Sequence, residues 1–283
     1  MPTSTSADVA AKPRLDAELV RRGLARSRQH AQELVASGRV RVGGLVATKP
    51  ATGVDAGASL VVAEATGEDY VSRGAHKLAG ALDALGGPAV ADRRCLDAGA
   101  STGGFTDVLL RRGAREVVAV DVGYGQLAWS LRTDPRIQLH ERTNVRDLSC
   151  ASVGGPVELV VADLSFISLA LVLDPLLSVT REDGALALMV KPQFEVGKER
   201  VGKGGVVRDL ALRAEAVTTI ADLAAERGWG AVAVTVSPLP GPSGNVEFFL
   251  LLRRGPASIG ADEIRAEVER AGSMGVAGER VDP

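Results

Sequence analysis

The sequence is poor in cysteine. Its 283 residues include only two, Cys95 and Cys150, which form neither a C-x-x-C pair nor a disulfide framework. A disulfide-stabilised scaffold is therefore excluded, and two distant thiols are typical of a protein of the reducing cytoplasm. We predict no metal site in this chain.

The chain also lacks a long apolar run. No stretch approaches the ~20 apolar residues that a membrane-spanning helix requires, and the first dozen residues are polar, without the apolar segment of a signal peptide. The lack of a long amphipathic or spanning segment counts against a pore-forming protein. We therefore expect a soluble cytoplasmic protein with no membrane partner.

The chain as a whole carries little net charge, but its first 60 residues carry an excess of basic residues. The formal net charge is only −2, yet residues 1–60 hold nine Lys or Arg against five Asp or Glu. This asymmetry suggests an anionic partner for the front of the chain, although the same charges also suit a solvated surface. With 46% hydrophobic residues, the chain is long enough to form one large and one small domain.

A polar lead without periodicity, residues 1–13, is predicted to be disordered, and a small α+β domain is expected over residues 14–62. Two short helices are expected there, the first ending at Gly23 and the second capped by Ser27. A hairpin follows, with its tight turn at Gly43-Gly44. Seven arginines are distributed through the domain, and guanidinium groups suit phosphate oxygens because they donate hydrogen bonds in pairs. They are Arg14, Arg21, Arg22, Arg26, Arg28, Arg39 and Arg41.

The order of these features resembles that of a known RNA-binding module. The phrases R-L-D-x-x-L-V-x-R-G-L-A-x-S-R (residues 14–28) and V-x-S-G-R-V-x-V-x-G (residues 35–44) are similar to the S4-like RNA-binding domain, which also occurs on RNA-modifying enzymes. The resemblance implies recognition of folded RNA by shape and phosphate contacts, as is usual for structured RNA. The seven arginines are then the expected RNA-binding residues.

The rest of the chain indicates a second, larger domain. Residues 63–72 are expected to form a linker, and residues 73–255 show apolar strands that alternate with helices, which is typical of a doubly wound α/β sheet. Beyond Gly255 the sequence ends in a Gly/Ala-rich stretch. We predict an unfolded C-terminal tail over residues 256–283.

The second domain is organised around a strand, a glycine loop and a helix between Arg94 and Leu110. Gly99 and Gly103 let the backbone turn sharply and let a ligand approach it, and the N-terminus of the helix would face that ligand. Such loops serve nicotinamide, flavin and S-adenosylmethionine (SAM) sites, and also turns that bind nothing. The spacing here, G-x-x-x-G-G rather than G-x-G-x-x-G, disfavours a dinucleotide.

Two further strand ends carry polar side chains. Asp121 closes the strand that starts at Glu116, where a carboxylate can accept hydrogen bonds from two ribose hydroxyls. The segment Asn144 to Asp147 follows a third strand, Ile137–His140, where a side chain can hold an adenine edge. Together with the glycine loop, these features predict a nucleoside site at the carboxyl edge of an open α/β sheet.

Charged residues stand where three other strands begin or end. Asp163 and Lys191 each follow an apolar strand, and Glu247 stands at the start of another. In a sheet whose fourth, fifth and seventh strands are neighbours, with the seventh antiparallel, these three side chains meet at the ligand-binding edge. A salt-bridged surface cluster is the alternative.

The residues around Asp163 narrow the chemistry. Asp163-Leu-Ser-Phe lacks the Asn/Asp-Pro-Pro-aromatic clamp expected of many exocyclic-amine methyltransferases, and neither cysteine stands in the Pro-Cys context expected for attack on a pyrimidine ring. An oxygen nucleophile remains. A ribose 2′-hydroxyl is a poor nucleophile until it is deprotonated or strongly oriented, and a lysine can accept its proton only when the amine is neutral.

Four charged residues occur in the order of the Lys-Asp-Lys-Glu tetrad of the FtsJ/RrmJ-type ribose 2′-O-methyltransferases. They are Lys77, Asp163, Lys191 and Glu247. With the S4-like domain and the phrases Ser-Arg-Gly-Ala-His-Lys77 and Val-Lys-Pro-Gln-Phe-Glu195, the chain is similar to the TlyA, or hemolysin-like, family. The resemblance implies a Rossmann-like, SAM-dependent methyltransferase fold, whose seven-stranded and mostly parallel sheet has an antiparallel last strand. It also implies 2′-O-methylation of cytidines in 16S or 23S ribosomal RNA, or both, within ribosomal subunits, and an effect on sensitivity to capreomycin-type antibiotics.

Carried over to the matching positions, the resemblance makes Lys191 the base, with Asp163 and Glu247 orienting it and Lys77 holding the tetrad or a substrate phosphate. It assigns the cofactor to Asp97, Gly99, Ser101, Gly103, Asp121 and Asp147. Two other classes stay open. One is a nucleotide-dependent oxidoreductase, and the other is a haemolytic or merely RNA-binding protein whose sheet has lost catalysis.

Overall fold

The computed structural model describes residues 12–25, 27–55, 57–63, 70–241 and 244–276. The chain divides into two compact units, Met1–Arg73 and Gly74–Pro283. Most of the predicted lead, most of the predicted linker and one predicted RNA-binding residue, Arg26, lie outside the described residues.

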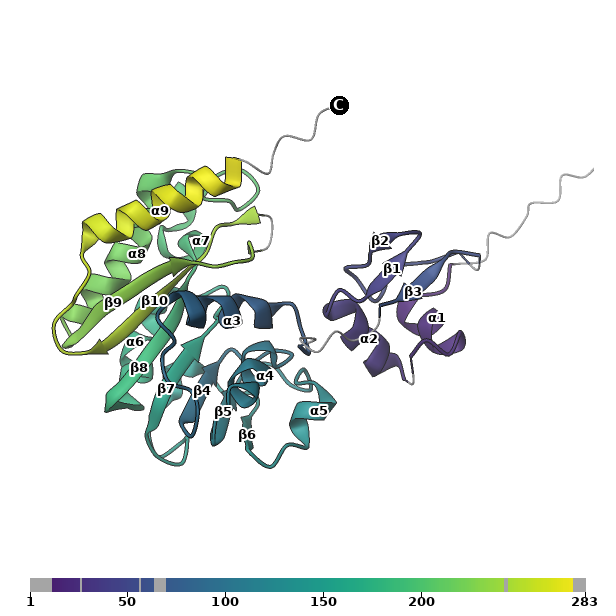
Figure 1. The fold of residues 1–283 in the computed structure, drawn as a ribbon, viewed down its shortest axis with the longest axis horizontal. Coiled ribbons are helices and arrows are strands. Elements are labelled where there is room, and N and C mark those ends of the chain that lie inside the picture. Colours follow the sequence, from purple (N-terminus) through teal and green to yellow (C-terminus); the bar gives the residue numbers. More distant parts are fainter. Residues whose placement is uncertain (1–11, 26, 56, 64–69, 242–243, 277–283) are drawn as a thin grey trace, which may run out of the picture. The chain divides into compact units, whose positions relative to one another are not determined.

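The first unit packs two helices against a small antiparallel sheet in the order β2-β1-β3 (Figure 1). Its elements are α1 (Leu15–Arg21), α2 (Arg28–Ala36), β1 (Val40–Val42), β2 (Leu45–Val46) and β3 (Leu60–Val62). Ser27 caps α2, because its side chain accepts a hydrogen bond from the His30 amide. The predicted helix pair and hairpin are confirmed. Strand β3 was not predicted, because three apolar residues in a row carry no alternation that marks a strand.

The second unit is built on a seven-stranded sheet in the order β6-β5-β4-β7-β8-β10-β9. Its strands are β4 (Arg94–Ala98), β5 (Glu116–Val120), β6 (Ile137–His140), β7 (Val157–Ala162), β8 (Thr180–Val190), β9 (Trp229–Val236) and β10 (Phe248–Arg254). Strands β4 to β8 pair in parallel, whereas β10 runs antiparallel to both β8 and β9. The predicted open sheet with an antiparallel last strand is confirmed.

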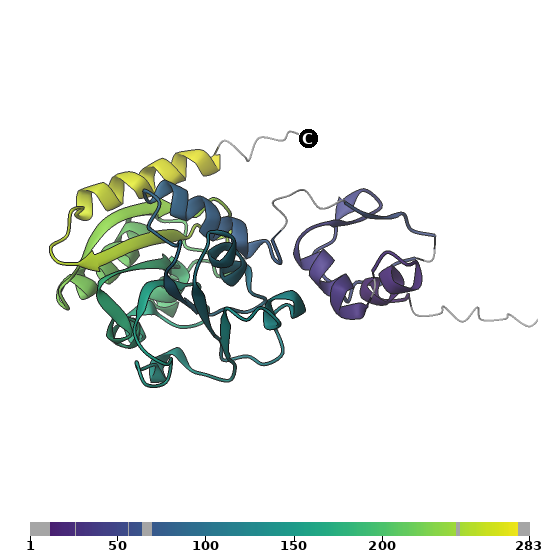
Figure 2. The same ribbon diagram turned by 60° about the horizontal axis from the view of Figure 1, so that its bottom comes forward.

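Helices pack on both faces of this sheet (Figures 1 and 2). Phe105 of α4 meets Phe249 of β10 on one face, with ring centroids 6.0 Å apart, and α3 packs beside α4. Phe248, the neighbouring residue of β10, points to the opposite face and lies in the largest core cluster with residues of α6, α8 and α9. The helices concerned are α3 (Gly74–Ala84), α4 (Gly104–Arg111), α6 (Leu173–Ser178), α8 (Leu210–Ala225) and α9 (Ala261–Val276).

Helix α9 contradicts the prediction of an unfolded tail beyond Gly255. Ile264 and Val268 are buried to 1% and 0% exposure in the core shared with α8 and β9, and α9 packs against α8 (Figure 1). Ile264, Val268 and Ala271 recur at helical spacing, which is the signal that the glycine- and alanine-rich end of the chain obscured. The second unit therefore extends beyond the predicted boundary.

Candidate active site

The glycine loop after β4 is shaped by its neighbours. Gly99 and Gly103 have φ angles of 88° and 96°, in the left-handed region that favours glycine. A Cβ on Gly99 would lie 2.6 Å from the carbonyl oxygen of Asp163, and a Cβ on Gly103 would lie 2.2 Å from the side chain of Leu131. Both positions therefore exclude a side chain, and the loop comes close to the backbone that follows β7.

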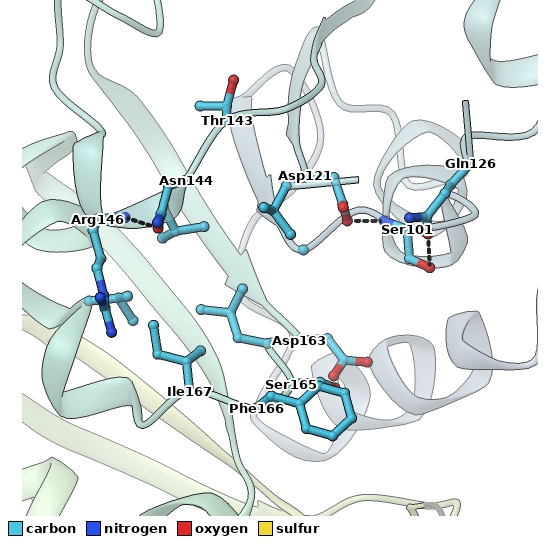
Figure 3. A pocket seen from close by; sticks show the side chains of 15 residues that line it. Ser101, Asp121, Gln126, Thr143, Asn144, Arg146, Asp163, Ser165, Phe166 and Ile167 are labelled. Carbon is cyan, nitrogen blue, oxygen red and sulfur yellow. Dashed lines mark hydrogen bonds between the residues drawn. The ribbon is translucent and has the colours of Figure 1, made fainter. Parts of the chain in front are cut away.

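Asp121, at the end of β5, holds this loop from the other side. Its two carboxylate oxygens accept hydrogen bonds from the backbone amides of Ser101 at 2.7 Å and Gly123 at 2.6 Å. Figure 3 shows the Asp121 side chain directed at Ser101. Each carboxylate oxygen keeps a second lone pair, so Asp121 can still accept hydrogen bonds from a ligand.

A pocket of about 590 Å³ opens at this edge of the sheet. Its lining comes from the ends of four neighbouring strands: Gly99 and Ser101 after β4, Asp121 after β5, Asn144 and Val145 after β6, and residues 163–167 after β7 (Figure 3). The volume lies in the range of small-molecule and cofactor sites. The structure thus brings three of the predicted cofactor residues together around one cavity.

The other three predicted cofactor residues do not line this pocket. Gly103 is covered by leucine side chains, and Asp147 is exposed at the end of a short 3₁₀ helix, η1 (Val145–Asp147). Asp97 is fully buried, with one oxygen accepting from Thr106 Oγ1 at 2.7 Å and the other without a hydrogen-bond partner. Burial raises the pKa of Asp97 to about 7. Gly103 lies at the end of the loop and Asp97 lies in β4 before it, and Asn144 lines the pocket in the place expected for Asp147.

The first tetrad pair joins the ends of β7 and β8. Lys191 Nζ lies 2.5 Å from Asp163 Oδ1 and donates a hydrogen bond to Ser165 Oγ at 2.9 Å. The Lys191 side chain is 7% exposed, and that of Asp163 is 25% exposed where it lines the pocket. The amine of Lys191 is therefore held at the boundary of the pocket by a partner on each side.

The second tetrad pair joins α3 to the start of β10. Lys77 Nζ lies 2.6 Å from Glu247 Oε2, and Glu247 is completely buried. The pairing of Phe248 with Val190 in the sheet places Glu247 next to the end of β8, where Lys191 stands. Gln193 Nε2 also donates to the second oxygen of Glu247, at 3.5 Å. This depth of burial speaks against the alternative of a solvated surface cluster.

The pairing differs in one respect from what the resemblance implies. Of the two carboxylates expected to orient Lys191, only Asp163 forms an ion pair with it, whereas Glu247 pairs with Lys77. The hydroxyl of Ser165 takes the second position beside Lys191. Ser165 was not predicted as a site residue. Its place two residues after Asp163 is a signal that could have indicated it, because a short loop there can turn back toward Lys191.

Phe166 was also missed, and it is the most unusual residue of the site. It is 91% exposed, has a φ of 65° and lies with its ring centroid 5.4 Å from that of Phe194. It lines both the first pocket and a second pocket of about 550 Å³, to which Gln193 and Lys198 also contribute. A bulky residue in the left-handed region is a local strain that the surrounding contacts must hold.

A buried acid organises two of the predicted RNA-binding residues in the first unit. Asp16 is 0% exposed and lies between Arg14 and Arg28, with closest ion-pair distances of 2.9 and 3.2 Å. It also accepts from Gln32 Nε2 at 3.2 Å. The hydrogen bonds from Arg14 and these neighbours hold the pKa of Asp16 well below its usual range, so the carboxylate is charged. The arginine side chains themselves stay 49% and 58% exposed.

A second buried acid, Glu18, holds the next pair. Arg21 and Arg22 lie 2.5 and 2.7 Å from Glu18 Oε1, and they lower the pKa of Glu18 to about 2. Arg22 also donates to the Ala58 carbonyl at 2.6 Å, and its side chain is only 22% exposed. Arg22 therefore ties α1 to the segment before β3, which is a structural contact.

The remaining predicted arginines contact the backbone. Arg39 Nη2 donates to the Ala63 carbonyl at 2.8 Å, and Arg41 Nη1 donates to the Gly44 carbonyl at 3.1 Å. The predicted arginines are thus held by several different partners. Arg14 and Arg28 share one buried acid, Asp16.

The described residues also bear on other kinds of site. Among them, no helix is long and apolar enough to cross a membrane, and no group of three or more His, Cys, Asp or Glu side chains is arranged to hold a metal ion. Burial raises the pKa of the Cys95 thiol to about 12, so Cys95 remains protonated and is not a thiolate nucleophile.

Two family matches cover most of the chain. Residues 70–254 match the family described as FtsJ-like methyltransferase, and residues 13–60 match the S4 domain. The chain is 59% identical over 268 residues to the 16S/23S rRNA (cytidine-2′-O)-methyltransferase TlyA of Mycobacterium tuberculosis, an alignment that covers 94% of this chain and 100% of that protein. It is 35% identical over 236 residues to Hemolysin A of Brachyspira hyodysenteriae, which covers 83% of this chain and 97% of that protein.

A solved structure agrees with these matches. A protein of Streptococcus thermophilus described as a hemolysin is 34% identical, with a TM-score of 0.75 over 95% of this chain and 98% of that one. The methyltransferase match spans the sheet and both tetrad pairs, so the oxidoreductase alternative is set aside. This chain belongs to the TlyA family of FtsJ-like methyltransferases that carry an S4 domain.

Proposed function

We propose that this protein transfers a methyl group from SAM to the 2′-hydroxyl of cytidines in ribosomal RNA, in the 16S molecule, the 23S molecule or both. The observation that carries the proposal is the arrangement of two ion pairs, Lys191 with Asp163 and Lys77 with Glu247, of which Asp163 lines a nucleoside-sized pocket. The M. tuberculosis relative is named for this activity. On this proposal the protein acts on ribosomal subunits in the cytoplasm, and its loss lowers sensitivity to capreomycin-type antibiotics.

The lining of the first pocket fits SAM. The free lone pairs of Asp121 suit the two ribose hydroxyls, Asn144 and Val145 stand where an adenine edge would lie, and Gly99 leaves room for close approach of the ligand. SAM supplies an activated methyl group. The residues of this chain bind it and set its direction toward the tetrad.

The chemistry that we assign to the tetrad is proton removal from the 2′-hydroxyl. Lys191 Nζ, in its neutral form, would accept that proton and so free the ribose oxygen to take the methyl group that SAM would supply, with the sulfur–methyl bond breaking as the oxygen–methyl bond forms. Asp163, 2.5 Å away, stabilises the ammonium group that results, and Ser165 fixes its direction. Lys77, held by Glu247, contributes positive charge near the substrate backbone or keeps the tetrad in place.

The first unit is the proposed carrier of the RNA. Its S4 match and the Arg14–Asp16–Arg28 cluster support recognition of phosphates on a folded RNA. Guanidinium groups that a buried acid holds in one direction lose less side-chain entropy on binding than free ones do.

Replacement of the proposed base tests this function. In Lys191→Ala, transfer of tritiated methyl groups from SAM to unmodified ribosomal subunits is expected to fall by ~10²- to 10⁴-fold, the usual contribution of a positioned base, while SAM binding persists. Lys203→Ala, at an exposed lysine outside both pockets, is the matched control and should keep full activity. Near-normal activity of Lys191→Ala would remove Lys191 as the base. A methyl group mapped by mass spectrometry to a base ring would overturn the oxygen-nucleophile mechanism.

A further inference from the structure

One partly buried carboxylate close to the tetrad has no role in the chemistry above. Glu195 ends the short helix α7 (Pro192–Glu195), which begins directly after Lys191. One oxygen of Glu195 accepts from Ser168 Oγ at 2.5 Å, and the other accepts from the Leu169 amide at 2.9 Å. Burial raises the pKa of Glu195, and these two hydrogen bonds oppose that shift.

These two hydrogen bonds join segments that are far apart in the sequence. Ser168 and Leu169 start a 3₁₀ helix, η2 (Leu169–Leu171), that closes the loop after β7, whereas α7 follows β8. Ser168 also accepts from the Ala170 amide at 3.1 Å, so it acts as the cap of η2. Glu195 therefore fastens the far end of the loop 163–168 to the segment after β8 that begins with Lys191.

The same loop carries the residues that meet Lys191. Its near end holds Asp163 and Ser165, both within 3 Å of Lys191 Nζ, and its middle residue is the strained Phe166. Residues 163–167 line the first pocket, and Phe166 lines the second as well. A shift of this loop therefore moves the partners of the proposed base and the shared wall of both pockets at once.

We propose that Glu195 is a positioning residue for methyl transfer, and this inference rests on the proposed function. By holding Ser168 and Leu169, Glu195 keeps the loop 163–168 at the distance from β8 at which Ser165 and Asp163 meet Lys191. Position 195 requires a side chain long enough to meet both Ser168 and Leu169, and it does not require a charge. Displacements of about 1 Å between reacting groups cost up to ~10²-fold in rate, so loss of the fastening acts mainly on kcat.

Three substitutions separate reach from charge. Glu195→Gln keeps the length of the side chain, because its amide oxygen can accept from Leu169 and its nitrogen can donate to Ser168 Oγ. Glu195→Asp keeps the charge but is one carbon too short to meet both partners, and Glu195→Ala removes both properties. Glu215→Asp, at an exposed glutamate paired with Arg200, is the matched control.

Two measurements are made on each full-length variant. Methyl transfer to ribosomal subunits gives kcat and KM, and hydrogen exchange with mass spectrometry gives the protection of the amides of residues 164–171. We expect Glu195→Asp and Glu195→Ala to lower kcat by about 10- to 100-fold with little change in KM, and to speed exchange in this segment. Glu195→Gln and Glu215→Asp should resemble the wild type in both measurements.

The possible outcomes are distinguishable. An active Glu195→Asp beside an inactive Glu195→Gln would show that the charge acts, and faster exchange with unchanged kcat would show a purely structural contact. Either result overturns the inference. A wild-type protein without methyl transfer would refute the proposed function instead, and exchange that stays slow in Glu195→Asp and Glu195→Ala would refute the fastening regardless of activity.

Discussion

At the scale of single residues, the two tetrad pairs have different surroundings. Glu247 is fully buried against Lys77, whereas Asp163 is 25% exposed and faces the pocket with Lys191. Removal of one partner from a buried pair leaves an uncompensated charge, at a cost of about 3–5 kcal/mol. Variants of Glu247 therefore report on folding as well as on activity. Variants of Lys191 report more directly on chemistry, because the partner they leave behind reaches solvent.

The cofactor role of Asp121 can be tested against a neighbouring acid. Asp121→Ala removes the acceptor for the ribose hydroxyls and frees the amides of Ser101 and Gly123 that hold the loop. We expect SAM affinity, measured by calorimetry, to fall by about 10- to 100-fold, since hydrogen bonds to a charged group contribute about 1.5–3 kcal/mol. Asp147→Ala is the control. Asp147 is exposed outside the pocket, so equal losses in the two variants would contradict this assignment.

The sequence shows which residues come near the site, but not how their side chains pair. Asp163, Lys191 and Glu247 stand at strand ends, and the order of strands in the sheet brings such positions to one edge. Lys77 pairs with Glu247 because of where α3 packs, and Ser165 contacts Lys191 because of the conformation of the loop after β7. Neither side-chain reach nor loop conformation has a periodic signal in a sequence.

At the scale of secondary-structure elements, burial decided what could be predicted. The core strands β5 and β7 are buried along most of their length and stand out in the sequence as short valine-rich runs, and the edge strand β6 has the predicted bounds, Ile137–His140. Strand β8 begins at Thr180, before the apolar run Ala185 to Val190 that stands out in the sequence, because Thr180 pairs with Val157 of β7 and the regular pairing then resumes at Ala185 after an irregularity. Pairing with a neighbouring strand can extend an element into sequence that shows no strand pattern.

Helix α9 supplies a test of stability at this scale. Ile264→Ala removes a side chain that is 1% exposed in the core with α8, and we expect a loss of about 2–5 kcal/mol in the free energy of unfolding of the second unit. Urea unfolding can be followed by tryptophan fluorescence, because Trp229 lies in the same core. Arg265→Ala, at the exposed neighbouring position, is the control. Equal unfolding free energies for the two variants would mean that α9 does not pack as described.

At the scale of the whole molecule, charge is divided between two units with different tasks. The net charge of −2 conceals a basic front and an acidic remainder, and this asymmetry together with the S4 motif predicted two domains. The sequence did not show that Asp16 and Glu18 are buried among the arginines. Acidic side chains in the first turn of a helix usually stay in solvent, where they interact with the helix dipole. The burial of Asp16 and Glu18 therefore depends on the packing between α1 and α2.

Two arginines with different surroundings test how the first unit holds RNA. Arg28 is 58% exposed and places only Nη2 on Asp16, whereas Arg22 is 22% exposed and binds both Glu18 and the Ala58 carbonyl. We expect Arg28→Gln to weaken binding of ribosomal RNA and to reduce the slope of log affinity against log salt by about 1, because one phosphate contact and its released counterion are lost.

Arg22→Gln should leave that slope unchanged and should instead lower the unfolding free energy of the first unit, because it breaks an ion pair and a hydrogen bond between α1 and the segment before β3. Binding is measured by filter retention over a series of salt concentrations, with unfolding of each variant measured in parallel. A reduced slope in Arg22→Gln with a normal slope in Arg28→Gln would reverse the assignment. The RNA-facing surface of the unit would then lie around Glu18 rather than around Asp16.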